Sequence, residues 1–244
     1  MCGRYVSASP PDELARYFGT KAPAAELEQS FNVAPTNEVY TVRFDAGARS
    51  LTAMTWGLVP FWAKDRKVGS RMINARSETA AEKPAFRRAF GWRRCLIPAD
   101  GFFEWAKIPG EKRKQPYFIH RDDDERLVFA GLWERWTPKD AEGEYLEEET
   151  LETCTILTTS ANATIAPVHD RMPVLLAPGR WDDWLNPDTD PASLRPLLQP
   201  APEGLLVLRP VTTMVNSVRN KGPELVVEAT AEQLIGVPSD VVTP

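Results

Sequence analysis

Cysteine and histidine are scarce in this sequence of 244 residues, which holds three cysteines and two histidines. Cys2, Cys95 and Cys154 are odd in number and far apart, and no C-x-x-C pair occurs. This spacing argues against a disulfide framework and against a zinc finger, so we expect no metal and no cofactor. No run approaches the ~18 consecutive apolar residues that a membrane span needs, and the N-terminus has no apolar signal-peptide core. We therefore expect a protein of the reducing cytoplasm that does not attach to membranes.

Basic residues are in the minority, because 29 lysines and arginines stand against 34 acidic residues and leave a net charge of −5. A chain with this balance is not a bulk binder of nucleic acid, since affinity for phosphates comes from clustered Lys and Arg. The charge is nevertheless uneven. Residues 64–94 carry ten basic and three acidic side chains, whereas residues 140–152 carry seven acidic and no basic ones. The first segment predicts a local anion-binding patch, and the second predicts a solvated loop or hairpin tip.

Long helical patterns are also lacking, and short runs rich in β-forming residues dominate, mostly bounded by Pro, Gly or Asp. We expect strands at residues 38–44, 51–56, 95–105, 117–121, 127–136, 153–159, 172–176 and 205–210. Helices should be few and short. Their expected start signals are Ser9-Pro10-Pro11-Asp12, Pro84, Asp190-Pro191 and a capping box at Thr230 and Gln233, with the last helix ending at Gly236 and Pro238. No linker or repeat divides the chain, and the pattern predicts an α+β fold around antiparallel strands.

Cys2 directly follows the initiator Met1, and its small side chain is of the kind that aminopeptidases tolerate. A mature chain that begins with Cys2 carries a thiol, of ordinary pKa ~8.5, beside an α-amine of pKa ~7.7–8.0. This pair can condense with an aldehyde into a five-membered thiazolidine. Alternatively, the thiolate can attack an acyl carbon with its own amine as base, as in enzymes with an N-terminal nucleophile. A cysteine that lies beside Met1 by accident is the third interpretation.

Two further side chains are candidates for proton transfer. Strand alternation places Glu104 on the same face as Phe102 among aromatic neighbours, and apolar surroundings raise the pKa of a carboxyl towards neutral pH. His169 lies in a loop between Pro167 and Pro173, where a histidine is well placed for acid–base work. The competing interpretations are a surface glutamate or a buried ion-pair partner for Glu104, and a loop-ordering hydrogen bond for His169.

A single-strand nucleic-acid signal comes from residues 56–79. Asn74 offers an amide that can orient or polarise a carbonyl, and Arg76 can pair with a phosphate. The preceding run includes Trp56, Pro60 and Trp62, whose rings could stack on unpaired bases. Trp and Pro are more often core and turn residues, but aromatics followed directly by a basic segment favour single-strand binding.

With these motifs together, the sequence closely resembles the SOS response-associated peptidase family, the abasic-site processing proteins that crosslink to single-stranded DNA. The matching motifs are residues 1–5, 31–36, 56–60, 74–79, 101–105, 158–162, 169–173 and 215–216. They run from residue 1 to about 220, so the resemblance implies one domain over residues 1–244. It also implies a β-rich α+β fold with a mostly antiparallel pseudo-barrel core and short flanking helices.

The resemblance further implies a role for each matching position. Met1 would be removed, and Cys2 would form a stable thiazolidine with the ring-opened aldehyde of an abasic deoxyribose. Asn74 would orient the nucleophile and sugar, Glu104 would handle protons during Schiff-base formation, and His169 would serve the ring-opened sugar and reversal of the link. The residues expected to contact the DNA strand are Arg4, Arg76 and Arg171 at phosphates and Trp56, Pro60 and Trp62 along the channel. The expected partner is single-stranded DNA that contains abasic sites, and we expect a monomer.

Two other functions stay open from the sequence. One is a cysteine peptidase in which the same Cys2, Glu104 and His169 assist acyl transfer, either on other substrates or once, to remove Met1. The other is a non-covalent single-strand binding module, which would be indifferent to loss of Cys2 and would lose affinity steeply with salt.

Overall fold

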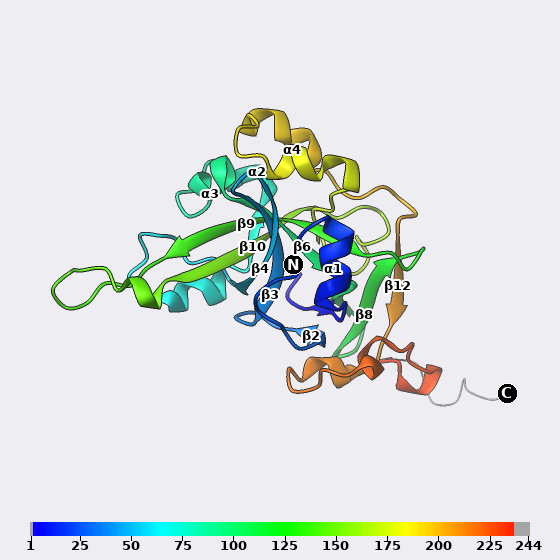
Figure 1. Cartoon of the computed structure of the whole chain (residues 1–244). Coiled ribbons are helices and arrows are strands. Elements are labelled where there is room, and N and C mark those ends of the chain that lie inside the picture. Colours follow the sequence, from blue (N-terminus) through cyan, green and yellow to red (C-terminus); the bar gives the residue numbers. More distant parts are fainter. Residues whose placement is uncertain (1, 237–244) are drawn as a thin grey trace.

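The computed structural model describes residues 2–236, and its centre is a closed five-stranded barrel (Figure 1). The strands follow one another around the barrel in the order β10, β4, β3, β6 and β9, and β9 pairs again with β10. The β10–β4 pairing is parallel and the other four are antiparallel. Their bounds are Glu38–Asp45 (β3), Ala48–Trp56 (β4), Arg94–Ala99 (β6), Leu127–Trp136 (β9) and Leu151–Ser160 (β10). The expected α+β fold with a mostly antiparallel barrel core is therefore confirmed.

Two short strands extend the barrel sheet at β10. β5 (Asn74–Arg76) pairs with it in parallel, and β11 (Arg171–Pro173) pairs with it antiparallel. Both lie on the half of β10 that ends at Ser160. Two of the motifs singled out in the sequence, around residues 74 and 171, are thereby brought to one strand.

A second sheet of five strands packs beside the barrel in the order β12, β8, β7, β1 and β2, with antiparallel pairings throughout. Its strands are Tyr5–Ser7 (β1), Ser30–Val33 (β2), Gly101–Lys107 (β7), Lys114–Arg121 (β8) and Leu206–Pro210 (β12). The single strand expected over residues 95–105 is thus wrong, because the chain passes from one sheet to the other at Asp100. Gly101 follows directly, and a Cβ there would lie 2.3 Å from the ring of Phe118.

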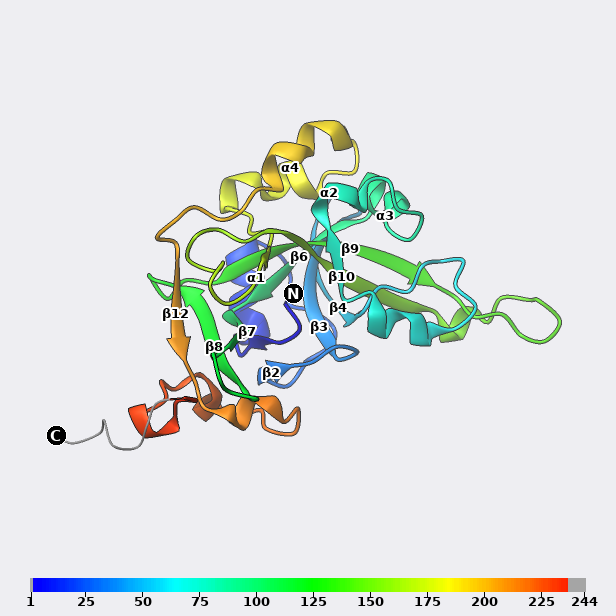
Figure 2. The same ribbon diagram turned by 180° about the vertical axis from the view of Figure 1, so that it is seen from behind.

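The helices are short, as expected, and three of them gather at one end of the barrel (Figures 1 and 2). The α-helices are Pro11–Phe18 (α1), Ser77–Ala80 (α2), Arg87–Trp92 (α3) and Trp181–Leu185 (α4). The start signals at Pro10-Pro11 and after Pro84 are confirmed by α1 and α3, but the one at Asp190 opens a 3-10 helix. The capping box of Thr230 and Gln233 is present around a single 3-10 turn. Pro238 lies outside the described residues.

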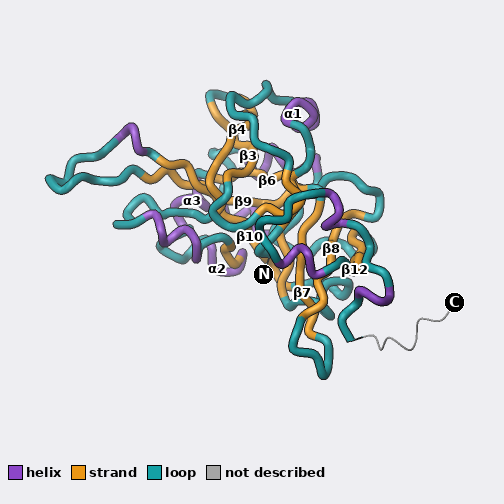
Figure 3. The backbone as a smooth tube through the Cα atoms, turned by 90° about the horizontal axis from the view of Figure 1, so that it is seen from below, coloured by secondary structure: helices purple, strands orange, loops and turns teal. Residues whose placement is uncertain are grey.

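Between β9 and β10 the chain forms a hairpin that projects far from the body of the protein (Figures 2 and 3). Its outer part, residues 137–150, carries most of the acidic segment and includes a 3-10 turn at Glu147–Glu149. The prediction of a hairpin tip for this segment is confirmed. Among the described residues no helix is long and apolar enough to cross a membrane.

Candidate active site

Cys2 lies in the core that the barrel shares with the second sheet. Its side chain is fully buried among apolar residues of both sheets, including Tyr5, Trp56 and Phe102. The strand that follows, β1, is held on one side by β2 and on the other by β7. The position of Cys2 is therefore fixed where the barrel and the second sheet pack against each other.

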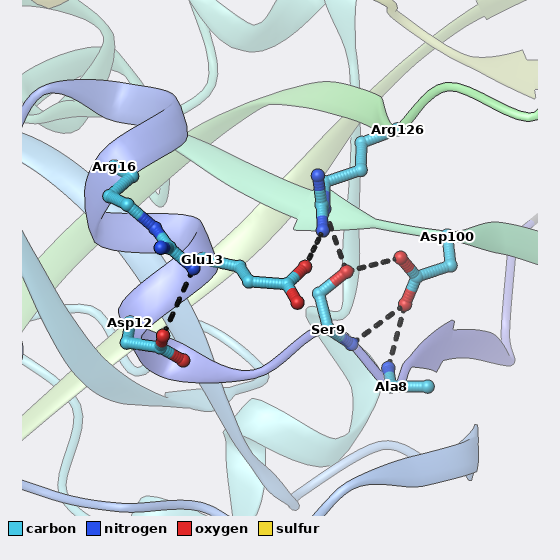
Figure 4. Close-up of polar contacts among 7 residues, drawn as sticks. All are labelled: Ala8, Ser9, Asp12, Glu13, Arg16, Asp100 and Arg126. Carbon is cyan, nitrogen blue, oxygen red and sulfur yellow. Dashed lines mark hydrogen bonds and ion pairs between the residues drawn. The ribbon is translucent and has the colours of Figure 1, made fainter.

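Asp100, at the crossing from β6 to β7, fixes the chain that leaves β1 (Figure 4). Its carboxylate accepts hydrogen bonds from the backbone N–H groups of Ala8 and Ser9, at 2.7 and 3.2 Å, and from the Ser9 hydroxyl at 2.5 Å. Arg126 donates to the same hydroxyl and pairs with Glu13 on α1. Charge-assisted bonds of this kind are stronger than neutral ones, so β1 is tied firmly to the turn beside it.

Asn74 reaches the N-terminus from β5. Its Nδ2 donates a hydrogen bond of 2.8 Å to the backbone carbonyl of Cys2. Its Oδ1 is buried, and among the described residues it has no hydrogen-bond partner. A buried acceptor without a partner costs free energy, so this atom is suited to receive a donor from a bound molecule.

Glu104 and Cys2 influence one another inside the protein. Glu104 lies on β7 and is 4 % exposed. Burial raises the pKa of its carboxyl, and the nearby His169 acts in the opposite sense. Burial also raises the pKa of the Cys2 thiol, and the charge of Glu104 raises it further. The sequence prediction of a glutamate with a raised pKa is thus confirmed, and the thiol is held in its neutral form.

His169 completes the group from the loop before β11. Its Nδ1 accepts a hydrogen bond from the backbone N–H of Arg171 at 2.9 Å and lies 2.8 Å from a carboxylate oxygen of Asp170. The loop-ordering hydrogen bond considered from the sequence is therefore present.

The three arginines expected at phosphates differ in their partners. Arg76 is exposed at the end of β5. Arg171 donates two hydrogen bonds to the carboxylate of Glu78, at 2.6 and 2.8 Å. Arg4 is half-buried and donates to the side-chain oxygen of Asn32 at 2.8 Å. A phosphate at Arg171 would compete with Glu78, whereas Arg76 is open to one.

The aromatic run divides into buried and exposed parts. Trp56 is fully buried, and its Nε1 donates to the carbonyl of Ile73 at 2.9 Å. Pro60 is buried as well. Both belong to the packing of the core, and this burial disfavours the predicted contact of Trp56 and Pro60 with a DNA strand. Trp62 is 52 % exposed and Phe61 46 %, so stacking surface exists at the end of this run.

Several positioning residues were not assigned a role from the sequence. Asn32 donates from Nδ2 to the carbonyls of three residues in the C-terminal segment, Val215, Ser217 and Asn220. Trp105, next to Glu104, donates to the side-chain oxygen of Asn216 at 2.7 Å. Both belong to motifs quoted above, but their partners are more than 100 residues away in the sequence. Only the folded chain shows these pairings.

No group of three or more His, Cys, Asp or Glu side chains within residues 2–236 could hold a metal ion. The functional groups that the site offers are the thiol of Cys2, the carboxyl of Glu104, the imidazole of His169 and the amide of Asn74. The fold and the site together define a β-barrel protein with a cysteine at position 2 placed beside a carboxyl, an imidazole and an amide.

Comparison with known proteins gives the family. Residues 1–218 match the model of the SOS response associated peptidase (SRAP) family, and the chain belongs to that family. The abasic site processing protein YoqW of Bacillus subtilis is 42 % identical over 230 residues, which cover 93 % of this chain and 99 % of that protein. The abasic site processing protein HMCES of Gallus gallus is 34 % identical and covers 81 % of this chain and 62 % of its own length.

Solved structures share the fold. A crystal structure of a protein from Bacteroides thetaiotaomicron superposes with a TM-score of 0.82 at 25 % identity and covers 94 % of this chain and all of that chain. A protein from Bordetella bronchiseptica gives a TM-score of 0.71 at 28 % identity and covers 86 % of this chain and all of that one.

Proposed function

We propose that this protein processes abasic sites in single-stranded DNA and that it does so by covalent capture through Cys2. The observation that carries the proposal is the juxtaposition of Cys2, Asn74, Glu104 and His169, which come from four separate segments. The names of the relatives supply the substrate, since they are called abasic site processing proteins.

The proposed reaction requires the α-amine of Cys2, which becomes free when Met1 is removed. The amine adds to the C1 aldehyde of the ring-opened deoxyribose, and loss of one water gives a Schiff base. The thiol then adds to the C=N carbon, and its proton passes to the nitrogen, which closes the thiazolidine. The net change is therefore the union of protein and DNA with loss of one water.

Each neighbouring residue has a part in this sequence. Glu104 in its protonated form can donate to the departing hydroxyl of the carbinolamine, and its carboxylate can accept the thiol proton. Asn74 holds the Cys2 carbonyl and offers its unpartnered Oδ1 to a donor on the sugar. His169 can serve the ring-opened sugar and assist reversal of the link. Arg76 is the phosphate contact that needs no rearrangement of an ion pair.

Intact mass spectrometry tests the proposal. The purified protein is measured before and after incubation with a single-stranded oligonucleotide that contains one abasic site. We expect loss of Met1, followed by a mass increase equal to the oligonucleotide less one water. Cys2→Ala should form no adduct, whereas the matched control Cys154→Ala should keep it, because Cys154 is a packing residue of the core. A chain that has lost Met1 and leaves the oligonucleotide unmodified contradicts the proposal.

The same experiment separates the two alternatives. A peptidase that removes its own Met1 predicts that Met1 stays attached in Glu104→Gln, even when the host has normal aminopeptidase. A non-covalent binding module predicts equal retention of DNA by the wild type and Cys2→Ala. The buried, neutral thiol of Cys2 disfavours an acyl-transfer site that depends on a ready thiolate.

A further inference from the structure

The projecting hairpin and the segment that follows Pro60 enclose a groove that the proposed reaction does not use. Trp136, at the base of the hairpin, donates from Nε1 to the carbonyl of Ala63 at 2.7 Å and thus joins the two segments. One cavity of about 490 Å³ lies between them, and an adjoining cavity of about 320 Å³ lies towards α3. Figures 1 and 2 both show the segment after Pro60 running beside β9 and β10.

Aromatic rings stand exposed on both walls of this groove. Phe61 and Trp62 line one wall, and Tyr145, which is 58 % exposed, lines the other. The guanidinium of Arg88 lies 4.4 Å from the ring centre of Phe61, and Lys139 Nζ lies 4.4 Å from that of Tyr145. Each wall therefore presents a ring with a cation beside it, a combination suited to single-stranded nucleic acid, whose bases stack on rings and whose phosphates bind cations.

The charge of the lining favours the same ligand. Its basic residues outnumber its acidic residue five to one, and they are Lys64, Arg88, Arg93, Arg135 and Lys139 against Glu147. Arg93 is paired with Glu134 and Arg135 lies 3.8 Å from Glu147, so the groove keeps three cations for a ligand. The acidic tip beyond it repels phosphates, so a bound strand crosses the hairpin at its base and does not follow it outwards.

The groove and the proposed active site lie at two positions along the same strand, β10. Asn74 pairs with Ile156 on β10, and Trp136 is opposite Leu151 on the same strand. Five residues of strand separate these points, or about 17 Å. That span corresponds to about five nucleotides at the 3.4 Å spacing of a stacked strand, and to fewer when the strand is extended.

We propose that this groove binds a stretch of the same DNA strand a few nucleotides away from the lesion, with a base stacked on Tyr145 and a phosphate at Lys139. The inference rests on the proposed function, which supplies the strand. It gives the hairpin a role in holding the DNA, while the chemistry stays at Cys2.

The test measures binding of an undamaged pyrimidine 20-mer by fluorescence anisotropy and capture of an abasic 5-mer by mass. Tyr145→Ala should weaken binding of the 20-mer at least fivefold, because one stacked base is lost. Tyr145→Phe should bind like the wild type, since it keeps the ring. Lys139→Ala should reduce the salt dependence of 20-mer binding. An abasic 5-mer held at Cys2 is too short to reach the groove, so its capture, measured by mass, should be unchanged in all these variants.

The matched control is Val227→Ala, which removes a side chain of 59 % exposure near Pro223–Val226. That segment lies at the opposite end of the molecule from the hairpin (Figures 1 and 2). Undiminished binding of the 20-mer by Tyr145→Ala overturns the inference, as does an equal loss in capture of the abasic 5-mer. If the wild type captures no abasic DNA, the proposed function is contradicted instead. The anisotropy measurements still show whether the groove binds undamaged DNA.

Discussion

At the scale of single residues, the site places a thiol and a carboxyl in surroundings that disfavour their charges. Burial raises the pKa of both Cys2 and Glu104, and each negative charge would oppose the other. The benefit for Schiff-base chemistry is that a carboxylic acid stays available as a proton donor at a pH where free glutamate has lost its proton.

Glu104→Gln tests this role in both rate and stability. Capture of an abasic oligonucleotide should slow by a factor of about 10²–10⁴, the usual contribution of a positioned acid–base group. Because the pKa of Glu104 is raised on folding, the folded wild type binds more protons than the unfolded chain above the ordinary pKa of glutamate. Its stability therefore falls as pH rises through the raised pKa, and the uncharged glutamine removes this decline.

Initial capture rates and thermal unfolding curves between pH 4 and 8 measure the two effects. Glu82→Gln is the matched control, because Glu82 is exposed, and it should leave both profiles as in the wild type. A Glu104→Gln variant that captures DNA at the full rate would show that the carboxyl takes no part.

Asn74→Ala tests positioning through the backbone. Loss of the 2.8 Å bond to the Cys2 carbonyl frees the N-terminus, and a small misplacement of a nucleophile can cost about 100-fold in rate. We expect the maximal single-turnover rate to fall by about 10- to 100-fold while the half-saturating DNA concentration changes little. Stopped-time gel assays over a range of DNA concentrations separate the two quantities. A loss confined to the half-saturating concentration would assign Asn74 to DNA binding instead.

The sequence indicated which polar residues lie together better than it indicated which aromatic residues are exposed. The motifs identified Cys2, Asn74 and Glu104, and the structure brings them together. The same reading grouped Trp56 with Trp62, which differ completely in exposure. Trp56 is the last residue of β4, and Trp62 lies in the loop six residues later. The sequence around them does not show which one is buried, because burial depends on packing against distant residues.

At the scale of elements, β1 is a short strand that helps to place Cys2, which lies three residues before it. It has three residues and depends on pairing with β2 and β7 and on the Asp100 contacts. Asp100→Ala removes three hydrogen bonds to a charged acceptor and should destabilise the protein by about 2–4 kcal/mol. Denaturant unfolding measures the change.

Asp12→Ala is the control for this prediction, because it removes a carboxylate of the same type on α1 (Figure 4). Asp12 pairs with Arg16 four residues on, and both side chains are about 70 % exposed, so the loss should be no more than about 0.5 kcal/mol. Equal destabilisation by the two substitutions would mean that the Asp100 contacts do not hold β1.

Long strands were predictable from their β-rich runs, and short ones were not. The runs at 38–44, 127–136 and 153–159 appear as β3, β9 and β10. By contrast β1, β2 and β5 have three or four residues, too few to show a period, and they exist because neighbouring strands complete their hydrogen bonds. The break at Asp100 was missed for a related reason, since its cause lies in contacts with residues 8 and 9.

At the scale of the whole molecule, a net charge of −5 coexists with a basic segment that borders the proposed site. We expect overall repulsion to keep non-covalent affinity for DNA modest and the local patch to direct a strand towards the proposed site at Cys2. A covalent link fits this balance, because a bond between protein and lesion does not depend on salt once it has formed.

Salt therefore separates the two stages of capture. The initial rate at subsaturating DNA should fall with ionic strength, and for single strands the slope of log affinity against log salt is about −0.7 for each phosphate contact. Arg76→Ala should weaken that slope by about 0.7, because the exposed Arg76 is the proposed phosphate contact two residues from Asn74. Arg16→Ala removes an equally charged, exposed side chain from α1 and should leave the slope unchanged. Adduct formed at low salt should survive transfer to 1 M salt in every variant, as gel analysis would show. Loss of the adduct on transfer would mean that ion pairs, and not a covalent bond, had retained the DNA.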